Sequence, residues 1–131
     1  MKKIICSLFI VASAFAACKG KSGASADQST PTGAANMIFD AAKSGDYSQL
    51  KNLCDASLTS DGDSRKVCEL ADGDEKMKSS FKEYFSTGKV VGEPVITGEE
   101  AKVKITFGPD GTKEEELNMQ KKDGKWYLYS F

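Results

Sequence analysis

The chain has 131 residues, 18 basic and 19 acidic side chains, and no histidine. This length accommodates one small domain and no more. The near balance of charge argues against nucleic-acid binding, which requires a basic face. The absence of histidine removes the commonest general base, the commonest metal ligand and every Ser-His or Cys-His nucleophile system. We therefore expect no catalytic set, no metal site, no cofactor and no nucleic-acid partner.

Residues 1–17 have the pattern of a bacterial signal peptide. The positive start Met1-Lys2-Lys3 precedes an uncharged, mostly apolar run from Ile4 to Phe15. Twelve helical residues rise only about 18 Å, which is too short for a hydrocarbon core of about 30 Å and fits a signal segment instead. Loss of Lys2 and Lys3 with the signal would leave 16 basic and 19 acidic residues, a net charge of −3.

The segment Phe15-Ala16-Ala17-Cys18 resembles a lipobox, the cleavage site of lipoprotein signal peptidase, with Phe15 in place of the usual leucine. The resemblance implies cleavage before Cys18 and a membrane anchor of two or three acyl chains on it, enough for stable attachment. An ordinary secretory cleavage among the small residues 12–16 is the alternative. Lys19 is not the aspartate that marks inner-membrane retention in enterobacterial lipoproteins. We expect a lipid-anchored envelope protein, at the outer membrane in a Gram-negative host.

The small, polar residues 19–31 cannot bury enough surface to offset the entropy of ordering, so we expect residues 18–31 to be the lipidated cysteine and a flexible tether. Residues 32–131 then form the domain. Apolar residues at a 3–4 spacing predict a first helix capped by Thr32 and ended at Ser44-Gly45. They also predict a second helix from Asp46 to about Leu58, a short helix around Val67–Leu70 and a third helix from Met77 towards Gly88.

From Lys89 the apolar period changes to two, which predicts strands. We expect strands over 89–97, 101–107, 112–120 and 125–131, with Pro94 at an edge or bulge and an Asp-Gly turn at 123–124. Helices followed by antiparallel strands indicate an α+β fold with the helices on one face of a sheet of about four strands.

Three features resemble the small nuclear-transport-factor-2-like (cystatin-like) domains of envelope lipoproteins. They are the segment AAKSGDYSQLKNLCD, the succession of strands and the ending KKDGKWYLYSF. The resemblance covers residues 33–131 and implies a curved sheet wrapped around helices, a cone that often has a pocket at its open end. The superfamily includes isomerases, dehydratases, binding proteins and structural partners, so the fold does not choose a function.

Cys54 and Cys68 are the cysteines that remain in the expected domain, and the envelope is an oxidising compartment. A disulfide between them would close a loop of about 15 residues and contribute about 3 kcal/mol. It requires a chain reversal, since fourteen residues of one helix would span about 21 Å. Two buried free thiols are the alternative.

Two groups of acidic residues are weak site candidates. Asp61, Asp63, Asp72 and Asp74 lack the spacing of a calcium loop and fit turns and helix N-caps better. Glu115 shares its strand face with Leu117 and Met119. At the mouth of an apolar pocket it would be a base, as in isomerases; a charge at the sheet edge is the simpler interpretation.

The last strand is apolar on both faces. We expect Trp126 and Leu128 to pack on the helices, chiefly on Phe81, Tyr84 and Phe85. Tyr127, Tyr129 and Phe131 would then line a pocket or an interface with a second copy or an envelope protein, unless the strand is central and covered on both faces. The sequence thus predicts a tethered, non-catalytic binding or interaction module. The alternatives are a carrier of a small apolar ligand and a lone-carboxylate isomerase or lyase, and a filled cone would favour the module.

Overall fold

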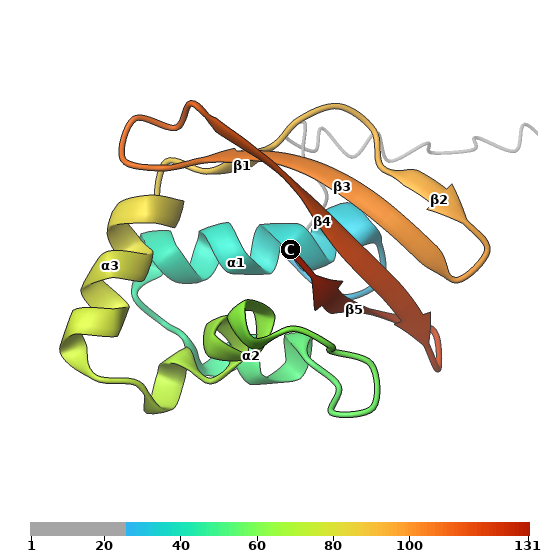
Figure 1. Cartoon of the computed structure of the whole chain (residues 1–131), viewed down its shortest axis with the longest axis horizontal. Coiled ribbons are helices and arrows are strands. Elements are labelled where there is room, and N and C mark those ends of the chain that lie inside the picture. Colours follow the sequence, from blue (N-terminus) through green and yellow to red (C-terminus); the bar gives the residue numbers. More distant parts are fainter. Residues whose placement is uncertain (1–25) are drawn as a thin grey trace, which may run out of the picture.

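The computed structural model describes residues 26–131, an α+β arrangement of helices followed by one antiparallel sheet (Figure 1). The signal segment, Cys18 and the tether up to residue 25 lie outside the described residues. The helical part contains α1 (Pro31–Ser44), the 3₁₀ helix η1 (Ser48–Leu53), α2 (Gly62–Cys68), the 3₁₀ helix η2 (Leu70–Asp72) and α3 (Glu75–Phe85). The sheet contains β1 (Lys89–Val90), β2 (Val95–Thr97), β3 (Glu100–Phe107), β4 (Lys113–Lys122) and β5 (Lys125–Ser130). None of the described helices is long and apolar enough to cross a membrane.

Helix α1 begins two residues earlier than the sequence indicated. Its N-cap is Thr30, whose hydroxyl accepts from the Gly33 N–H at 2.9 Å, and Pro31 occupies the first turn, where its missing N–H costs nothing. The expected cap, Thr32, lies inside the helix. Gln28 is already bound to the fold, because its backbone oxygen accepts from the Trp126 N–H at 2.9 Å. The domain therefore includes residues 28–31, which the sequence assigned to the tether.

The second helix is shorter and tighter than expected. The Asp46 carboxylate accepts from both the backbone N–H and the hydroxyl of Ser48, which forms a local turn instead of an α-helical cap. One 3₁₀ segment follows and ends at Leu53, and the chain continues extended through Cys54. Leu50 and Leu53 are fully buried, as their spacing predicted. Leu58 lies beyond the helix in a turn.

The expected first strand is divided into two short ones, so the sheet has five strands. Its order is β1-β3-β4-β5, and β2 also pairs with β3. Gly92 has φ +70° and Pro94 has no N–H to donate, so residues 91–94 loop away between β1 and β2. Strand β3 follows the predicted alternation: Ala101, Val103 and Ile105 point to the helices and are almost fully buried.

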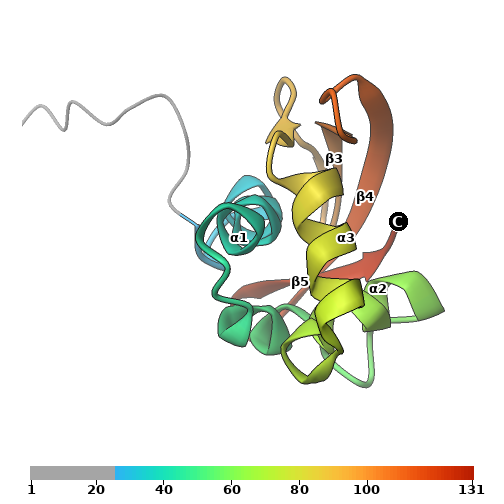
Figure 2. The same cartoon turned by 90° about the vertical axis from the view of Figure 1, so that its left-hand side faces the viewer.

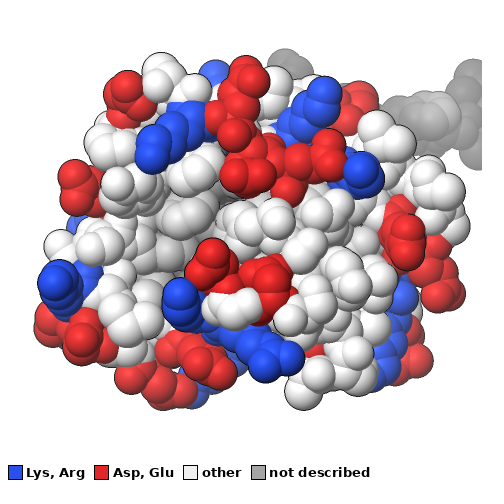
Figure 3. Space-filling model, viewed as in Figure 1, with Lys and Arg blue, Asp and Glu red and all other residues white. Residues whose placement is uncertain are grey.

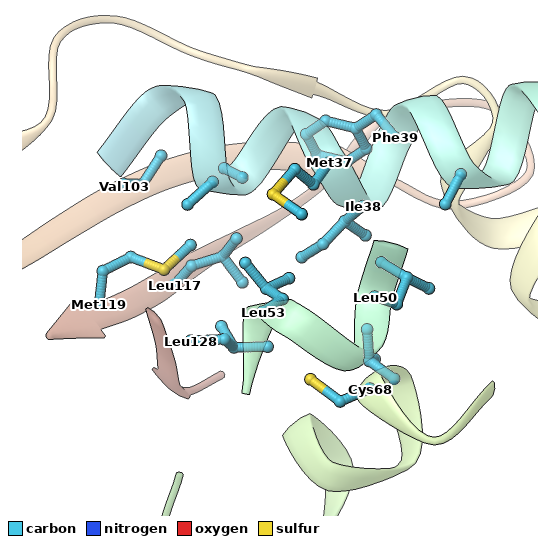
Figure 4. Close-up of a cluster of buried hydrophobic side chains, with 14 of the residues drawn as sticks. Met37, Ile38, Phe39, Leu50, Leu53, Cys68, Val103, Leu117, Met119 and Leu128 are labelled. Carbon is cyan, nitrogen blue, oxygen red and sulfur yellow. The ribbon is translucent and has the colours of Figure 1, made fainter. Parts of the chain in front are cut away.

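The helices cover one face of the sheet, and side chains fill the space between the helices and the sheet. In Figure 2, β5 turns away from β3 and β4 and passes beneath α1, so the sheet bends around that helix. Figure 4 shows side chains from α1, η1 and the sheet meeting in a single cluster. Its fully buried members include Ile38, Phe39, Leu50, Leu53, Leu117, Met119 and Leu128.

Phenylalanines close the end of the core between α3 and the sheet. The Phe85 ring lies 4.8 Å from that of Phe81, stacks on Phe107 at 5.3 Å and meets Phe131 at 6.3 Å. Stacked and tilted pairs of this kind each stabilise the fold beyond the contribution of the apolar area that they bury. The loop after β3 is fixed to the same end, since the Gly108 N–H donates to the Tyr84 carbonyl oxygen.

The disulfide between Cys54 and Cys68 is confirmed, with Cα atoms 5.9 Å apart. The chain reverses between them: it leaves η1 at Cys54, turns through residues 55–61 and returns along α2. The bond therefore joins the end of η1 to the end of α2, beside the buried Leu50 and Leu53.

We predict that replacing both cysteines by alanine lowers the free energy of unfolding by about 3 kcal/mol, because the unfolded chain regains the entropy of an open loop. Denaturant unfolding of the two proteins measures the difference. In a strong thiol reductant the difference should nearly disappear, and an equal stability of both proteins under oxidising conditions would contradict the prediction.

Candidate functional site

The face of the sheet that points away from the helices is the candidate site, and we call it the outer sheet face. It carries Lys102, Lys104 and Thr106 of β3, Glu114, Glu116, Asn118 and Gln120 of β4, and Tyr127, Tyr129 and Ser130 of β5. Most of these side chains are polar, as expected of a face in contact with water. Tyr127 and Tyr129 are half-buried aromatic groups in this setting.

A bulge in β5 decides which aromatic groups reach the outer sheet face. The register passes from Met119 opposite Leu128 to Asn118 opposite Ser130, so Tyr129 is an extra residue. Bulges re-aim side chains in this way. Tyr129 and Ser130 consequently line the same depression, and Phe131 turns back to Phe85 in the core. The expectation that Phe131 lies with Tyr127 and Tyr129 was wrong. Trp126 and Leu128 are buried on the helix side, as expected. The expectation that they pack chiefly on Phe81, Tyr84 and Phe85 was wrong, because β5 packs on α1, η1 and α2, and Phe131 is the residue that reaches Phe85 of α3.

Strand β5 is an edge strand, so the alternative that it lies centrally in the sheet was also wrong. Its free edge is nevertheless covered. The Thr59 hydroxyl donates to the Leu128 carbonyl oxygen at 2.8 Å, the Ser60 N–H donates to that of Tyr129, and Gln28 pairs with Trp126. These contacts satisfy backbone groups that an added strand would otherwise use.

A depression of about 310 Å³ lies on the outer sheet face and spans it from β2 to β5. Its lining side chains include Val95, Thr97, Glu100, Lys102, Asn118, Gln120, Tyr129 and Ser130. Figure 3, which views the molecule from the side of β4 and the C-terminus, shows a band of uncharged surface across the molecule, with acidic and basic side chains both above and below it. The depression thus combines an aromatic ring, two amides and hydroxyl groups.

Glu115 does not lie in an enclosed apolar cavity. Its side chain is exposed, and it borders a second depression, of about 500 Å³, together with Glu114, Glu116, Lys104 and Val91. Ile105, directly opposite on β3, is buried, so the strand face is apolar up to this position and meets water at Glu115. The structure therefore places this carboxylate at the edge of the sheet.

The four aspartates considered for calcium have structural partners. Asp61 caps α2 by accepting from the Ser64 N–H, and its other oxygen accepts from the Phe131 N–H at 3.3 Å. Asp74 caps α3 through the Met77 N–H, as the turn-and-cap interpretation predicted. Asp63 pairs with Lys66 and Asp72 with Lys51. Within residues 26–131 no cluster of acidic or cysteine side chains is arranged to hold a metal ion.

Asp55 and Lys122 join the disulfide loop to the β4–β5 hairpin, with Asp55 Oδ2 2.9 Å from Lys122 Nζ. A hydrogen bond from the Ser57 hydroxyl, with that from Lys122 and the Ser57 N–H, lowers the pKa of Asp55 to about 2. Sequence reasoning missed this contact, because the two residues are 67 positions apart and each alone is an ordinary charged residue in a turn or strand end.

No family model and no curated protein sequence matches the chain. A solved structure of a SEC-C motif containing protein from Rhodopseudomonas palustris aligns with 82% of this chain and 79% of that chain, at 16% sequence identity and a TM-score of 0.49. A likeness at this level defines neither a family nor a function for the chain.

The lowered pKa of Asp55 predicts a pH dependence. Since the folded-state pKa lies below the unfolded value of 3.8, the stabilisation is complete above about pH 5 and is lost as the pH falls towards 2. Asp55→Asn should therefore be less stable than the parent protein at neutral pH and should lose less stability between pH 5 and 2. Urea unfolding across this range measures the effect. The control, Asp40→Asn on the exposed side of α1, should follow the parent protein; parallel curves for Asp55→Asn would contradict the prediction.

Proposed function

We propose that this protein is a membrane-tethered, non-catalytic binding or interaction module of the bacterial cell envelope, and that it binds through the outer sheet face. The observation that carries the proposal is the depression on this face, where the half-buried ring of Tyr129 lies beside amide side chains. Tyrosines with an apolar ring and a polar tip suit surfaces that become buried on binding. The partner expected from the sequence is a small envelope protein or a second copy of the chain.

The filled core favours this module over a carrier of a small apolar ligand. The side chains between α1 and the sheet are fully buried, and the phenylalanines described above fill the end of the core between α3 and the sheet. An apolar ligand would need that space to be empty. The isomerase or lyase alternative gains no support from Glu115, which lies exposed at the sheet edge.

Two further parts of the proposal concern the class of domain and the anchor. We propose that the domain is nuclear-transport-factor-2-like (cystatin-like), and its support is that helices precede a meandering sheet that bends around α1 (Figure 2). The anchor would be the lipidated Cys18. Gln28, hydrogen-bonded to Asn52 and Trp126, fixes where the tether would leave the domain, which is near the β4–β5 hairpin.

Trp126 and Tyr129 provide a matched test, since both are aromatic residues of β5 on opposite faces. Trp126→Ala should cost about 3–5 kcal/mol, a large share of the stability of a small domain, and should unfold it. Tyr129→Ala should leave the domain folded and weaken association. Thermal melts measure the first effect. Sedimentation and native mass spectrometry of the protein purified from its own host measure the second. Equal destabilisation by both variants, with no change in association, would overturn the proposal.

The anchor is tested separately by Cys18→Ala. We expect the variant to accumulate as an uncleaved or differently cleaved precursor that does not label with a radioactive fatty acid, because the thiol that carries the lipid is gone. The parent protein serves as the positive control. A variant that still incorporates the label would show that the lipid is attached elsewhere or that the lipobox interpretation is wrong.

A further inference from the structure

We propose that the ligand of the outer sheet face is a neutral carbohydrate, bound in the depression lined by Gln120 and Tyr129. This inference rests on the proposed function, because it names the chemical class that the same surface would bind. Three properties of the depression carry it: the hydrogen-bonding groups that it presents, its balance of charge and the position of its aromatic ring.

The hydrogen-bonding groups of the depression match hydroxyl groups. The amides of Asn118 and Gln120 and the hydroxyls of Thr97 and Ser130 each both donate and accept, as the hydroxyls of a sugar do. Asn118 Nδ2 donates to Ser130 Oγ at 3.0 Å, which holds the two side chains of neighbouring strands in place. The Gln120 amide has no hydrogen-bond partner in the described part of the chain, so it is free to bind a ligand.

The charges of the depression select a neutral ligand. Lys102 is the cation of the lining set, and its ammonium lies 3.1 Å from a carboxylate oxygen of Glu116. An anionic ligand would have to compete with that carboxylate for the lysine. Glu100, exposed at the rim, is a carboxylate that accepts hydrogen bonds from hydroxyl groups. The lining of the depression therefore offers hydrogen-bond acceptors and a lysine whose charge is already paired with Glu116. Such a lining suits uncharged molecules that are rich in hydroxyl groups.

The aromatic ring supplies the apolar surface on which a sugar ring can pack. The bulge in β5 brings Tyr129 to the same side as Ser130, and Val95 of β2, 62% exposed, lines the opposite part of the depression. One face of a pyranose ring carries mainly C–H groups, which pack on aromatic and aliphatic side chains while the hydroxyls around it reach the amides. A volume of about 310 Å³ is at the small end of the range for ligand sites, so the depression would hold one or two sugar rings of an oligosaccharide.

A peptide strand is the competing occupant, and it would use a different part of the molecule. Strand addition requires a free edge, and the edge of β5 is covered by Gln28, Thr59 and Ser60. The edge of β2 carries the exposed Val95 and Ile96 and is where a strand would add. The depression instead presents side chains from several strands across the face of the sheet, which favours a ligand recognised by its hydroxyl groups.

The test measures binding of chitotriose and cellotriose to the full chain in a detergent without a sugar headgroup, by isothermal titration calorimetry. We expect at least one of these neutral trisaccharides to bind. Gln120→Ala and Tyr129→Ala should each weaken that binding by about tenfold or more, since one removes hydrogen bonds and the other a packed ring. The matched controls Gln49→Ala on η1 and Tyr84→Ala on α3 lie outside the depression and should bind as the parent protein does.

Several results would overturn the inference. If neither trisaccharide binds but Tyr129→Ala still alters association, the ligand class is wrong and the proposed function stands. If neither binds and Tyr129→Ala changes no association, both fail. If the site variants and the controls bind a trisaccharide equally, the sugar binds elsewhere and the inference is wrong. Should Tyr129→Ala prove unfolded in a thermal melt, Gln120→Ala decides the matter, because its half-buried side chain has no partner to lose within residues 26–131.

Discussion

The burial of α1 is the constraint on which the rest of the structure depends. Ala34, Ala35, Ile38 and Ala42 have no exposed surface, and the helix contacts α3, η1 and three strands of the sheet. Alanines allow neighbouring elements to approach closely, and each element that approaches removes apolar surface from water. Because the alanine side chains of α1 are short, the sheet has to bend around the helix to stay in contact with it. Because the bend brings the inner side chains together, the core between α1 and the sheet is full, and the outer sheet face is left uncovered by helices.

Much of this arrangement was predictable from local patterns. The alternation of Ala101, Val103 and Ile105 indicated the buried face of β3, and the spacing of Leu50 and Leu53 indicated a buried helical segment. The disulfide followed from compartment, count and the need for a chain reversal. The correct start of α1 was also within reach, since proline favours the first turn and Thr30 immediately precedes Pro31. A cap at Thr32 would leave Pro31 outside the helix, whereas Pro31 occupies its first position.

Other features depend on pairing that no local pattern records. The bulge at Tyr129 has no glycine to mark it; it exists because β5 must pair with β4 while its last residues reach the phenylalanines beneath α3. One extra residue reverses every later side chain, so strict alternation placed Phe131 on the wrong face. Asn118 and Gln120 gave no signal either, since polar residues on alternate positions indicate a solvated face. Only the pairing of four strands brings them beside Tyr129 and Val95.

The two edges of the sheet differ: loops cover the edge of β5, whereas β2 exposes Val95 and Ile96 at the other edge. At β5, two segments distant in sequence satisfy the backbone: Gln28 before α1, and residues 59–61, which run from the loop after Cys54 into the N-cap of α2. Asp61 joins the start of α2 to Phe131, because its carboxylate accepts hydrogen bonds from Ser64 and from the Phe131 N–H. Burial raises the pKa of this carboxyl, but the hydrogen bonds outweigh that effect, so the pKa is lowered overall and the carboxylate form is favoured. The β5 edge, on one side of the depression, is therefore closed to an added strand. A ligand that binds there must be recognised by side chains on the face of the sheet, and the hydroxyl, amide and tyrosine groups of the outer sheet face are the ones the fold presents to it.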